Sequence, residues 1–127
     1  MRYMGIDYGS KRVGIAISDE SGSFALPEAV IHMSKNIVAD IGKIIKEKGI
    51  KHIIIGESKD FKGADNAIMP KVRELKEKLE KEFDLPVEFE PEFLTSREAE
   101  HIQGKGEMHD ASAAALILKS YLARKSN

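Results

Sequence analysis

Short runs of apolar, strand-favouring residues separated by polar turns fill the first quarter of the chain, and in one of them Val13, Ile15 and Ile17 alternate with small residues, the period of two that β-strands have. Residues 2–8 and 13–19 are both apolar and rich in residues that favour strands, and the Gly-Ser-Lys-Arg segment 9–12 between them predicts a hairpin turn. A third strand is predicted over residues 24–32, where Pro27 favours an edge or bulge position.

After the third strand the apolar period lengthens to that of a helix. Residues 34–49 predict an amphipathic helix, with Ser34 as its N-cap and Gly49 as its C-terminal stop. The short apolar run 50–56 is typical of a strand buried on both faces of an α/β sheet. Residues 67–83 predict a second amphipathic helix, whose outer face carries opposite charges four positions apart and is therefore interpreted as a solvated surface.

The last third of the chain predicts one more strand and two more helices. Residues 85–93 alternate as a strand, and residues 95–102 begin with the spacing of a capping box, which predicts a short helix. A glycine-containing loop over 103–109 precedes a closing helix over 110–125, for which Asp110 is a natural N-cap.

This order of elements predicts an α/β fold. The sheet is expected to be mixed and five-stranded, with three antiparallel strands first and parallel strands after them, flanked by helices. Residues 1–127 are expected to form a single domain. In open sheets of this kind, chemistry gathers at the carboxyl ends of the parallel strands.

The composition narrows the function classes. The chain has 42% hydrophobic and 32% charged residues, as ordinary globular proteins have, and its lack of cysteine excludes disulfides, thiol catalysis and thiolate metal sites. A net charge of −1 argues against nucleic-acid binding by charge alone, but not against an enzyme that approaches phosphates through divalent ions and one basic patch. The chain meets a charge too early for a signal peptide and lacks a membrane-length apolar run, so a cytoplasmic location without membrane contact is expected.

Three carboxylates stand where local structure does not require them: Asp7 within the first strand, Glu92 just past the alternating segment 87–90 of the last strand, and Asp110 at the start of the closing helix. The predicted sheet brings them towards one edge, where a divalent ion would offset their repulsion, and oxygen ligands favour Mg²⁺ or Mn²⁺. Each also has a structural interpretation: a buried acid bonded to turn amides for Asp7, a solvated loop acid for Glu92 and a plain N-cap for Asp110.

Two segments carry a family resemblance. "GIDYGSKRVGIAISD" over residues 5–19 and "DASAAALILKSYL" over residues 110–122, with "IIIG" as a weaker marker, resemble the YqgF family, also called RuvX or Holliday-junction-resolvase-like proteins. The similarity runs over essentially the whole chain. It implies an RNase H-like fold, which agrees with the order of elements predicted above.

The resemblance implies a metal-dependent nuclease that acts in pre-16S rRNA processing. The family's three acidic positions fall on Asp7, Glu92 and Asp110, which would hold Mg²⁺ or Mn²⁺ for hydrolysis of a phosphodiester bond. The substrate-binding residues that it implies are Lys11, Arg12, Thr95 and Ser96. For Lys11 and Arg12 the alternative is an exposed turn that only increases solubility.

Two segments differ from the usual family pattern. Residues 57–62 replace a Leu-Pro pair and a later Asn, and Pro91 and Phe93 replace the Asp and Arg that usually flank the glutamate. Losing the Arg removes a phosphate contact, and losing the Asp removes a charge near the metals. These differences favour either a divergent branch with another substrate or a branch with weakened activity.

Other functions also fit parts of the pattern. The opening segment resembles the first phosphate loop of the actin, sugar-kinase and chaperone ATPase superfamily, but those proteins enclose ATP between two such domains. A non-catalytic module that binds RNA or protein on the same fold is a second alternative. Within the nuclease reading, cleavage of a four-way DNA junction would require a dimer. The sequence has no aromatic stripe or long apolar patch, so a monomer or weak dimer that processes single-stranded RNA is preferred.

Overall fold

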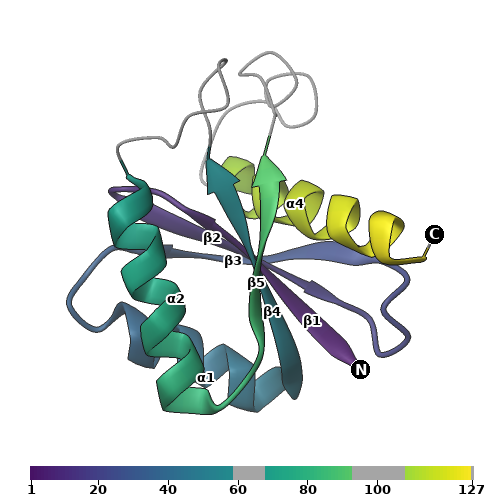
Figure 1. Ribbon diagram of the computed structural model, residues 1–127, viewed down its shortest axis with the longest axis horizontal. Helices are drawn as coiled ribbons and strands as arrows, with labels where there is room; N and C mark the ends of the chain where they lie inside the picture. Colours follow the sequence, from purple (N-terminus) through teal and green to yellow (C-terminus); the bar gives the residue numbers. More distant parts are fainter. Residues whose placement is uncertain (59–67, 93–107, 127) are drawn as a thin grey trace.

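A computed structural model gives the structure of the protein and describes residues 1–58, 68–92 and 108–126 (Figure 1). Its elements are β1 (Arg2–Tyr8), β2 (Arg12–Ser18), β3 (Ala25–His32), α1 (Ile37–Lys48), β4 (Ile50–Ser58), α2 (Met69–Phe83), β5 (Val87–Glu92) and α4 (Met108–Ser126). The five strands form one sheet in the order β3-β2-β1-β4-β5. β2 is antiparallel to β1 and β3, whereas β4 is parallel to β1 and β5. The predicted mixed sheet is confirmed.

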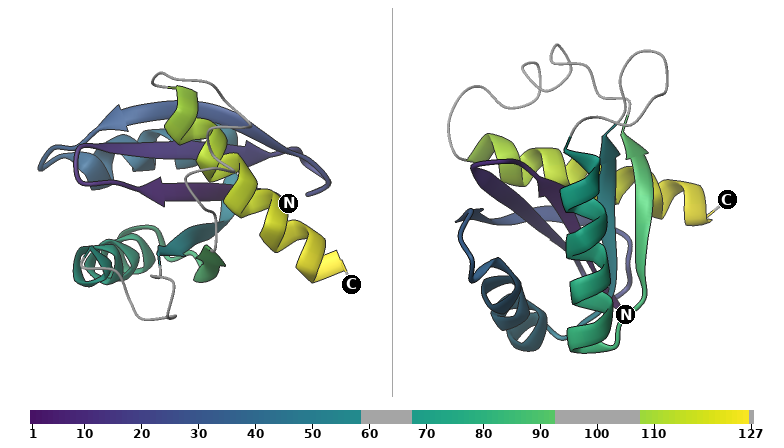
Figure 2. Two further views of the ribbon diagram at one scale, coloured as in Figure 1. Left: turned by 90° about the horizontal axis from the view of Figure 1, so that it is seen from above. Right: turned by 60° about the vertical axis from the view of Figure 1, so that its left-hand side comes forward.

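The sheet separates two apolar clusters, because successive side chains of a strand point to opposite faces. On one face, Met4 and Ile6 of β1 pack with the buried residues of α1 and α2. On the other face, Tyr3 of β1 packs with Ala114 and Leu118 of α4. Figure 2 shows α4 lying across the sheet on the side away from α1 and α2. The strand β1 therefore lies at the centre of the molecule, with helices on both sides.

Gly5 lets α4 approach the sheet closely. A Cβ atom at this position would lie 2.8 Å from the Ala114 carbonyl oxygen and 2.8 Å from the Leu118 Cβ, which is closer than real Cβ atoms come to other atoms. The backbone of α4 thus contacts the backbone of β1 directly. This close contact fixes the distance between the helix and the central strand.

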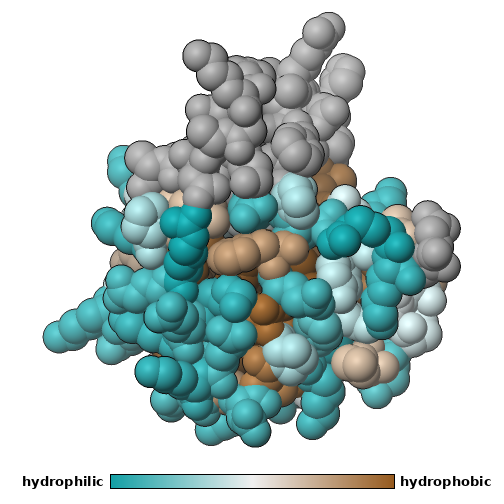
Figure 3. Space-filling model, viewed as in Figure 1, coloured by the Kyte–Doolittle hydropathy of each residue, from teal (hydrophilic) through white to brown (hydrophobic). Residues whose placement is uncertain are grey.

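The strand β5 forms one edge of the sheet. A narrow apolar strip runs over β5 between hydrophilic side chains on either side (Figure 3). Phe89 is half-buried there, and the Lys76 ammonium of α2 lies 5.9 Å from its ring centroid. β3 forms the opposite edge, and its register with β2 shifts by one residue at Glu28, next to Pro27, so the proline lies beside a bulge as predicted.

The ends of α1 only partly follow the prediction. Gly49 has a left-handed conformation with φ of 64°, and its N–H donates to the Ile45 carbonyl, which confirms the predicted C-terminal stop. The Ser34 N-cap is wrong, because the cap position is Asn36 and no side chain caps it. The Ser34 hydroxyl instead accepts a hydrogen bond of 3.1 Å from the Asn36 N–H, which closes the turn before the helix.

Two further boundaries differ from the prediction. Glu92 is the last residue of β5 and does not lie past the strand, and α4 begins at Met108, so that Asp110 lies in its first turn and is not its N-cap. The predicted helix over 95–102 lies outside the described residues. No helix in the described part of the chain is both long and apolar enough to cross a membrane.

Replacing Gly5 by alanine should destabilise the protein, because the added methyl group must push α4 away from β1. Overpacking of this kind costs about 1–3 kcal/mol of unfolding free energy. Urea denaturation of Gly5→Ala, with Ala39→Ser on the exposed side of α1 as control, measures the change. Equal stability of the two variants would contradict the direct contact between α4 and β1.

Candidate active site

Several elements meet at one end of the sheet (Figure 1). The strands β1, β4 and β5 all finish there, and the first turn of α4 lies towards the same end. This is the edge at which the sequence places its candidate chemistry. Asp7, the last residue but one of β1, is half-buried there.

Asp7 lies on the face of the sheet that α4 covers, because it alternates with Tyr3 and Gly5. Its partner in β2 is Gly14. Its neighbour in β4 is Gly56, which follows directly after the pair of Ile6 with Ile55. The positions on both sides of Asp7 thus present no side chain on this face. A carboxylate in such surroundings can be approached by a phosphate or by a hydrated cation.

The contacts of α4 direct its first turn towards Asp7. Tyr3 packs on Tyr121, with ring centroids 6.0 Å apart, and Gly5 lies against Ala114. From Gly5 to Asp7 the strand advances about 6.6 Å. From Ala114 back to Asp110 the helix covers about 6 Å, towards the same end of the sheet. The backbone therefore places Asp110 near the level of Asp7.

Glu92 also belongs to the α4 face, because it alternates with Glu90 along β5. Glu90 is paired with Gly56 and so lies level with Asp7, two strands away, or about 10 Å at the backbone. Glu92 is two residues closer to the carboxyl edge, opposite Ser58.

The side chains of Glu92 and Asp110, and all of Thr95 and Ser96, lie outside the described part of the structure. Within the described part, no three His, Asp or Glu side chains form a cluster that could hold a metal ion. The backbone alone thus places the three predicted acids on one face of the sheet and at one edge. The donor set fits Mg²⁺ or Mn²⁺, because all three are carboxylates and Asp7 lies between two glycines.

Lys11 and Arg12 are exposed in the turn that follows Asp7. The turn is tight, because a Cβ atom at Gly9 would lie 2.6 Å from the Arg12 carbonyl oxygen. The Met33 N–H donates to the Lys11 carbonyl at 2.8 Å and ties the turn to the end of β3. Arg12 alternates with Gly14 and so belongs to the same face as Asp7. This turn therefore holds two cationic side chains beside the candidate site.

The sequence did not reveal the role of Glu90, whose alternation with apolar residues is typical of a solvated position. Glu90 is only 4% exposed. One carboxylate oxygen accepts a hydrogen bond of 2.9 Å from the Ser120 hydroxyl, and the other pairs with the Arg124 guanidinium. Both partners lie on α4, 30 or more residues away in sequence. Glu90 therefore anchors α4 to β5.

Glu88 makes a second link between β5 and α4. Its carboxylate accepts hydrogen bonds from the Tyr121 hydroxyl at 2.7 Å and is 2.6 Å from His52 Nε2. The Tyr121 hydrogen bond is the largest cause that lowers the pKa of Glu88. Burial, followed by the Glu88 carboxylate, raises the pKa of Tyr121 to about 12. The Tyr121 phenol thus stays protonated and donates at neutral pH.

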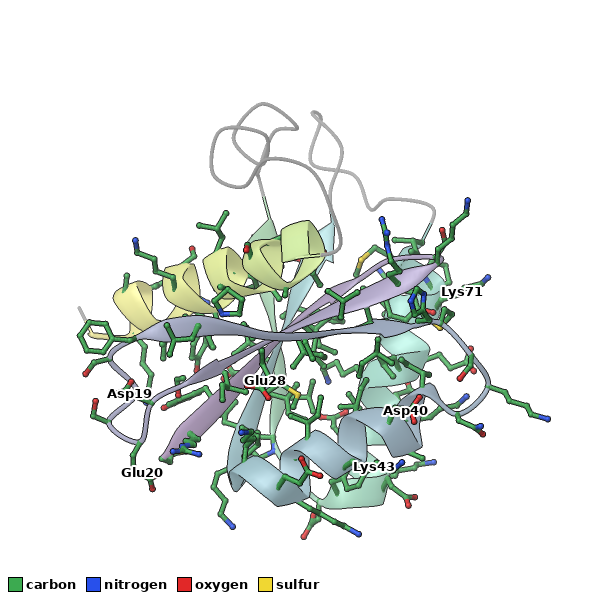
Figure 4. The ribbon with its side chains drawn as sticks, turned by 180° about the vertical axis from the view of Figure 1, so that it is seen from behind. Asp19, Glu20, Glu28, Asp40, Lys43 and Lys71 are labelled. Carbon is green, nitrogen blue, oxygen red and sulfur yellow. The ribbon has the colours of Figure 1, made fainter. Side chains whose placement is uncertain are left out.

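The Ser-Asp pair at the end of the opening motif has a structural role. The Ser18 hydroxyl accepts from the Tyr3 N–H at 2.8 Å and donates to the Asp19 carbonyl at 2.9 Å. Asp19 lies in the turn between β2 and β3 (Figure 4), where one carboxylate oxygen accepts from the Ser23 and Phe24 N–H groups, each at 2.8 Å. This turn lies at the opposite end of β2 from Arg12, so these motif residues hold the hairpin and lie away from the candidate site.

Position 91 faces away from Asp7. Pro91 is paired with Glu57 and alternates with Glu90 and Glu92, so it belongs to the face that α1 and α2 cover. An aspartate at this position would therefore extend to the other side of the sheet. The expectation that its loss removes a charge near the metals stays a prediction, although the register places this position on the other face of the sheet from Asp7. Phe93 lies outside the described residues.

Comparisons with known proteins agree with this architecture. The sequence model of the family described as RuvX, Holliday junction resolvase, matches residues 1–124. A relative from Leuconostoc citreum, named "Putative pre-16S rRNA nuclease", is 31% identical over 96% of this chain and 94% of its own length. A relative of the same name from Nitratidesulfovibrio vulgaris is 35% identical over 96% of this chain and 93% of its own.

Two solved resolvases share the fold. RuvC of T. thermophilus, in complex with a Holliday junction substrate, has a TM-score of 0.67 at 17% identity, covering 100% of this chain and 97% of its own. The fowlpox virus resolvase in complex with Holliday junction DNA has a TM-score of 0.63 at 12% identity, covering 100% of both chains. These neighbours confirm the predicted RNase H-like architecture.

Glu90→Gln should lower the unfolding free energy by about 1.5–3 kcal/mol, the range for hydrogen bonds to charged groups, because it removes the ion pair that ties α4 to β5. Arg124→Ala should lower the unfolding free energy, and with it the melting temperature, more than Glu90→Gln does, because it leaves the buried Glu90 carboxylate without its cation. Thermal unfolding of both variants, with Glu80→Gln on α2 as control, tests this order. A larger effect for Glu90→Gln would contradict it.

The Asp19 carboxylate should titrate well below its ordinary range. The Ser21 hydroxyl, followed by the backbone N–H of Phe24, lowers its pKa from 3.8 to about 2. Because the folded pKa is the lower one, this stabilisation is present above pH 3.8 and is lost as the pH falls through about 2. Carboxyl ¹³C NMR measures the pKa, and the stability advantage over Asp19→Asn should shrink across this window. An unshifted pKa would show that the turn does not form.

Proposed function

The chain belongs to the RuvX family of Holliday junction resolvases, and on this premise we propose that it is a metal-dependent nuclease that hydrolyses a phosphodiester bond. The proposed site comprises Asp7, Glu92 and Asp110, and the proposed catalytic unit is a single domain of residues 1–127. The proposed location is the cytoplasm.

The placement of Asp7 is the observation that supports this proposal most. A central strand packed by helices on both sides holds its carboxylate more rigidly than a loop could. The flanking glycines, Gly14 and Gly56, leave that carboxylate accessible on the α4 face.

Asp7, Glu92 and Asp110 would hold Mg²⁺ or Mn²⁺ between them. When bound, such ions activate water and stabilise the departing oxygen of a phosphodiester. The protein's own contribution is to fix three carboxylates on two strands and one helix whose mutual positions are set by Gly5, Glu88 and Glu90. Lys11 and Arg12 would contact the phosphates next to the cut and so hold the strand over Asp7.

The preferred substrate is the precursor of 16S rRNA, cut in the course of its 5′-end processing. The names of the relatives support this choice, because they share 31% and 35% identity over nearly the whole chain. Branched DNA is the second candidate, since the family description names it. We propose that the protein acts on RNA as a monomer or weak dimer.

Asp7→Asn should abolish cleavage while leaving the fold intact, since asparagine has nearly the same shape but no charge to hold a cation. The loss should exceed the roughly 10–100-fold typical of residues that only orient metal ligands. The measurement is cleavage of an end-labelled 16S precursor leader with Mg²⁺ or Mn²⁺, beside a four-way DNA junction. Glu47→Gln, on the exposed side of α1, is the matched control.

A second readout separates metal binding from turnover. Calorimetric titration with Mn²⁺ should show a site in the wild type that Asp7→Asn, Glu92→Gln and Asp110→Asn each weaken. Cleavage that persists in Asp7→Asn would overturn the proposed chemistry. If the wild type cuts neither substrate with either metal, the protein is a non-catalytic binding module.

A further inference from the structure

A pocket of about 270 Å³ opens on the face of the sheet opposite Asp7. It lies between the end of β1, the connection from β3 to α1, and the first half of α2. Its floor is apolar and includes Met33, Val38, Leu75 and the ring of Tyr8. Polar groups from Ser34, Lys35, Lys71, Glu74 and Lys78 surround this floor.

The charges around the pocket favour an anion. Glu74 is already paired with Lys78, with 2.9 Å between carboxylate oxygen and Nζ. Lys35 and Lys71 have no ion-pair partner among the described residues, and both are exposed. Figure 4 shows Lys71 beside the end of the β1–β2 hairpin, next to the pocket. Two cationic groups beside apolar lining residues match a ligand with a flat apolar part and a negative part.

Tyr8 links this pocket to the candidate active site. It directly follows Asp7 in β1, and strand alternation sends the two side chains to opposite faces of the sheet. A nucleic-acid strand that crosses the end of β1 with one phosphate at Asp7 would reach this pocket next.

We propose that the pocket binds an unpaired nucleotide adjacent to the scissile phosphate, with its base over Tyr8 and its phosphate between Lys35 and Lys71. This inference rests on the proposed nuclease function and specifies its substrate as a strand that is single at this position. A base within a duplex is stacked and paired, so it cannot enter a pocket of this size. Aromatic faces bind unpaired bases of any sequence, which predicts little sequence preference here.

Binding of RNA without metal tests the pocket separately from catalysis. A fluorescein-labelled single-stranded RNA of twelve nucleotides is titrated with wild type, Lys71→Glu, Val38→Trp and Lys43→Glu in EDTA, and anisotropy gives each affinity. Lys43→Glu makes the same charge change on the outer side of α1, away from the pocket (Figure 4). Val38→Trp fills the pocket without changing charge. Circular dichroism confirms that each variant is folded.

Lys71→Glu and Val38→Trp should each weaken single-strand binding by about tenfold, the loss expected when one stacked base is released. Lys43→Glu should stay within about twofold of the wild type, since screened surface charge away from the ligand contributes little. A duplex RNA of the same sequence should bind all four proteins alike. If all variants bind the single strand equally, or if single strand and duplex lose affinity together, the pocket assignment is overturned.

The same variants distinguish this inference from the proposed function. If cleavage depends on Asp7 but the pocket variants bind RNA as the wild type does, the proposed nuclease function is supported and the proposed nucleotide pocket is contradicted. If the wild type cuts neither substrate but the pocket variants bind single-stranded RNA more weakly than it does, the nucleotide pocket is supported and the nuclease function is contradicted.

Discussion

The missing side chain at Gly5 determines how α4 meets the sheet, and the rest of the site depends on that contact. Because nothing separates the two backbones, Ala114 and Leu118 lie directly on the central strand. Glu90 holds the same helix again through Ser120 and Arg124, more than one turn further on. Two contacts along one helix fix both its rotation and its position along its axis. The first turn, with Asp110, is placed by these contacts even though it makes neither of them.

Neighbouring residues of the central strand β1 point to opposite faces of the sheet and have different surroundings there. Asp7 extends towards α4, where the neighbouring positions in β2 and β4 are glycines. Tyr8 extends towards α1 and α2, where it borders a pocket with two cationic groups. The proposed nuclease site and the proposed nucleotide pocket therefore lie on opposite faces of the same strand end. This division follows from the strand period of two and from no other feature of the fold.

Most of the fold follows from periodicity, which is local in the sequence. The apolar, strand-favouring run 2–8 and the glycine at position 49 identify β1 and the end of α1 correctly. Ser34 was misassigned as an N-cap because Asn36, two residues later, is an equally polar candidate. The partners of Glu90 could not be predicted, since they lie 30 and 34 residues away and depend on how α4 crosses the sheet. The register similarly decides which acids share a face, and the sequence alone does not supply it.

That register also bears on Pro91, a position where the family resemblance implies an aspartate. β5 is an edge strand with β4 as its one neighbour in the sheet, so a proline is compatible with it. Position 91 belongs to the face of α1 and α2, whereas Glu92 belongs to the face of Asp7. Replacing the family's aspartate by proline therefore leaves the charges on the Asp7 face unchanged. An aspartate at position 91 would extend towards the face that α1 and α2 cover, so strand alternation separates this position from the side of the sheet that carries Asp7.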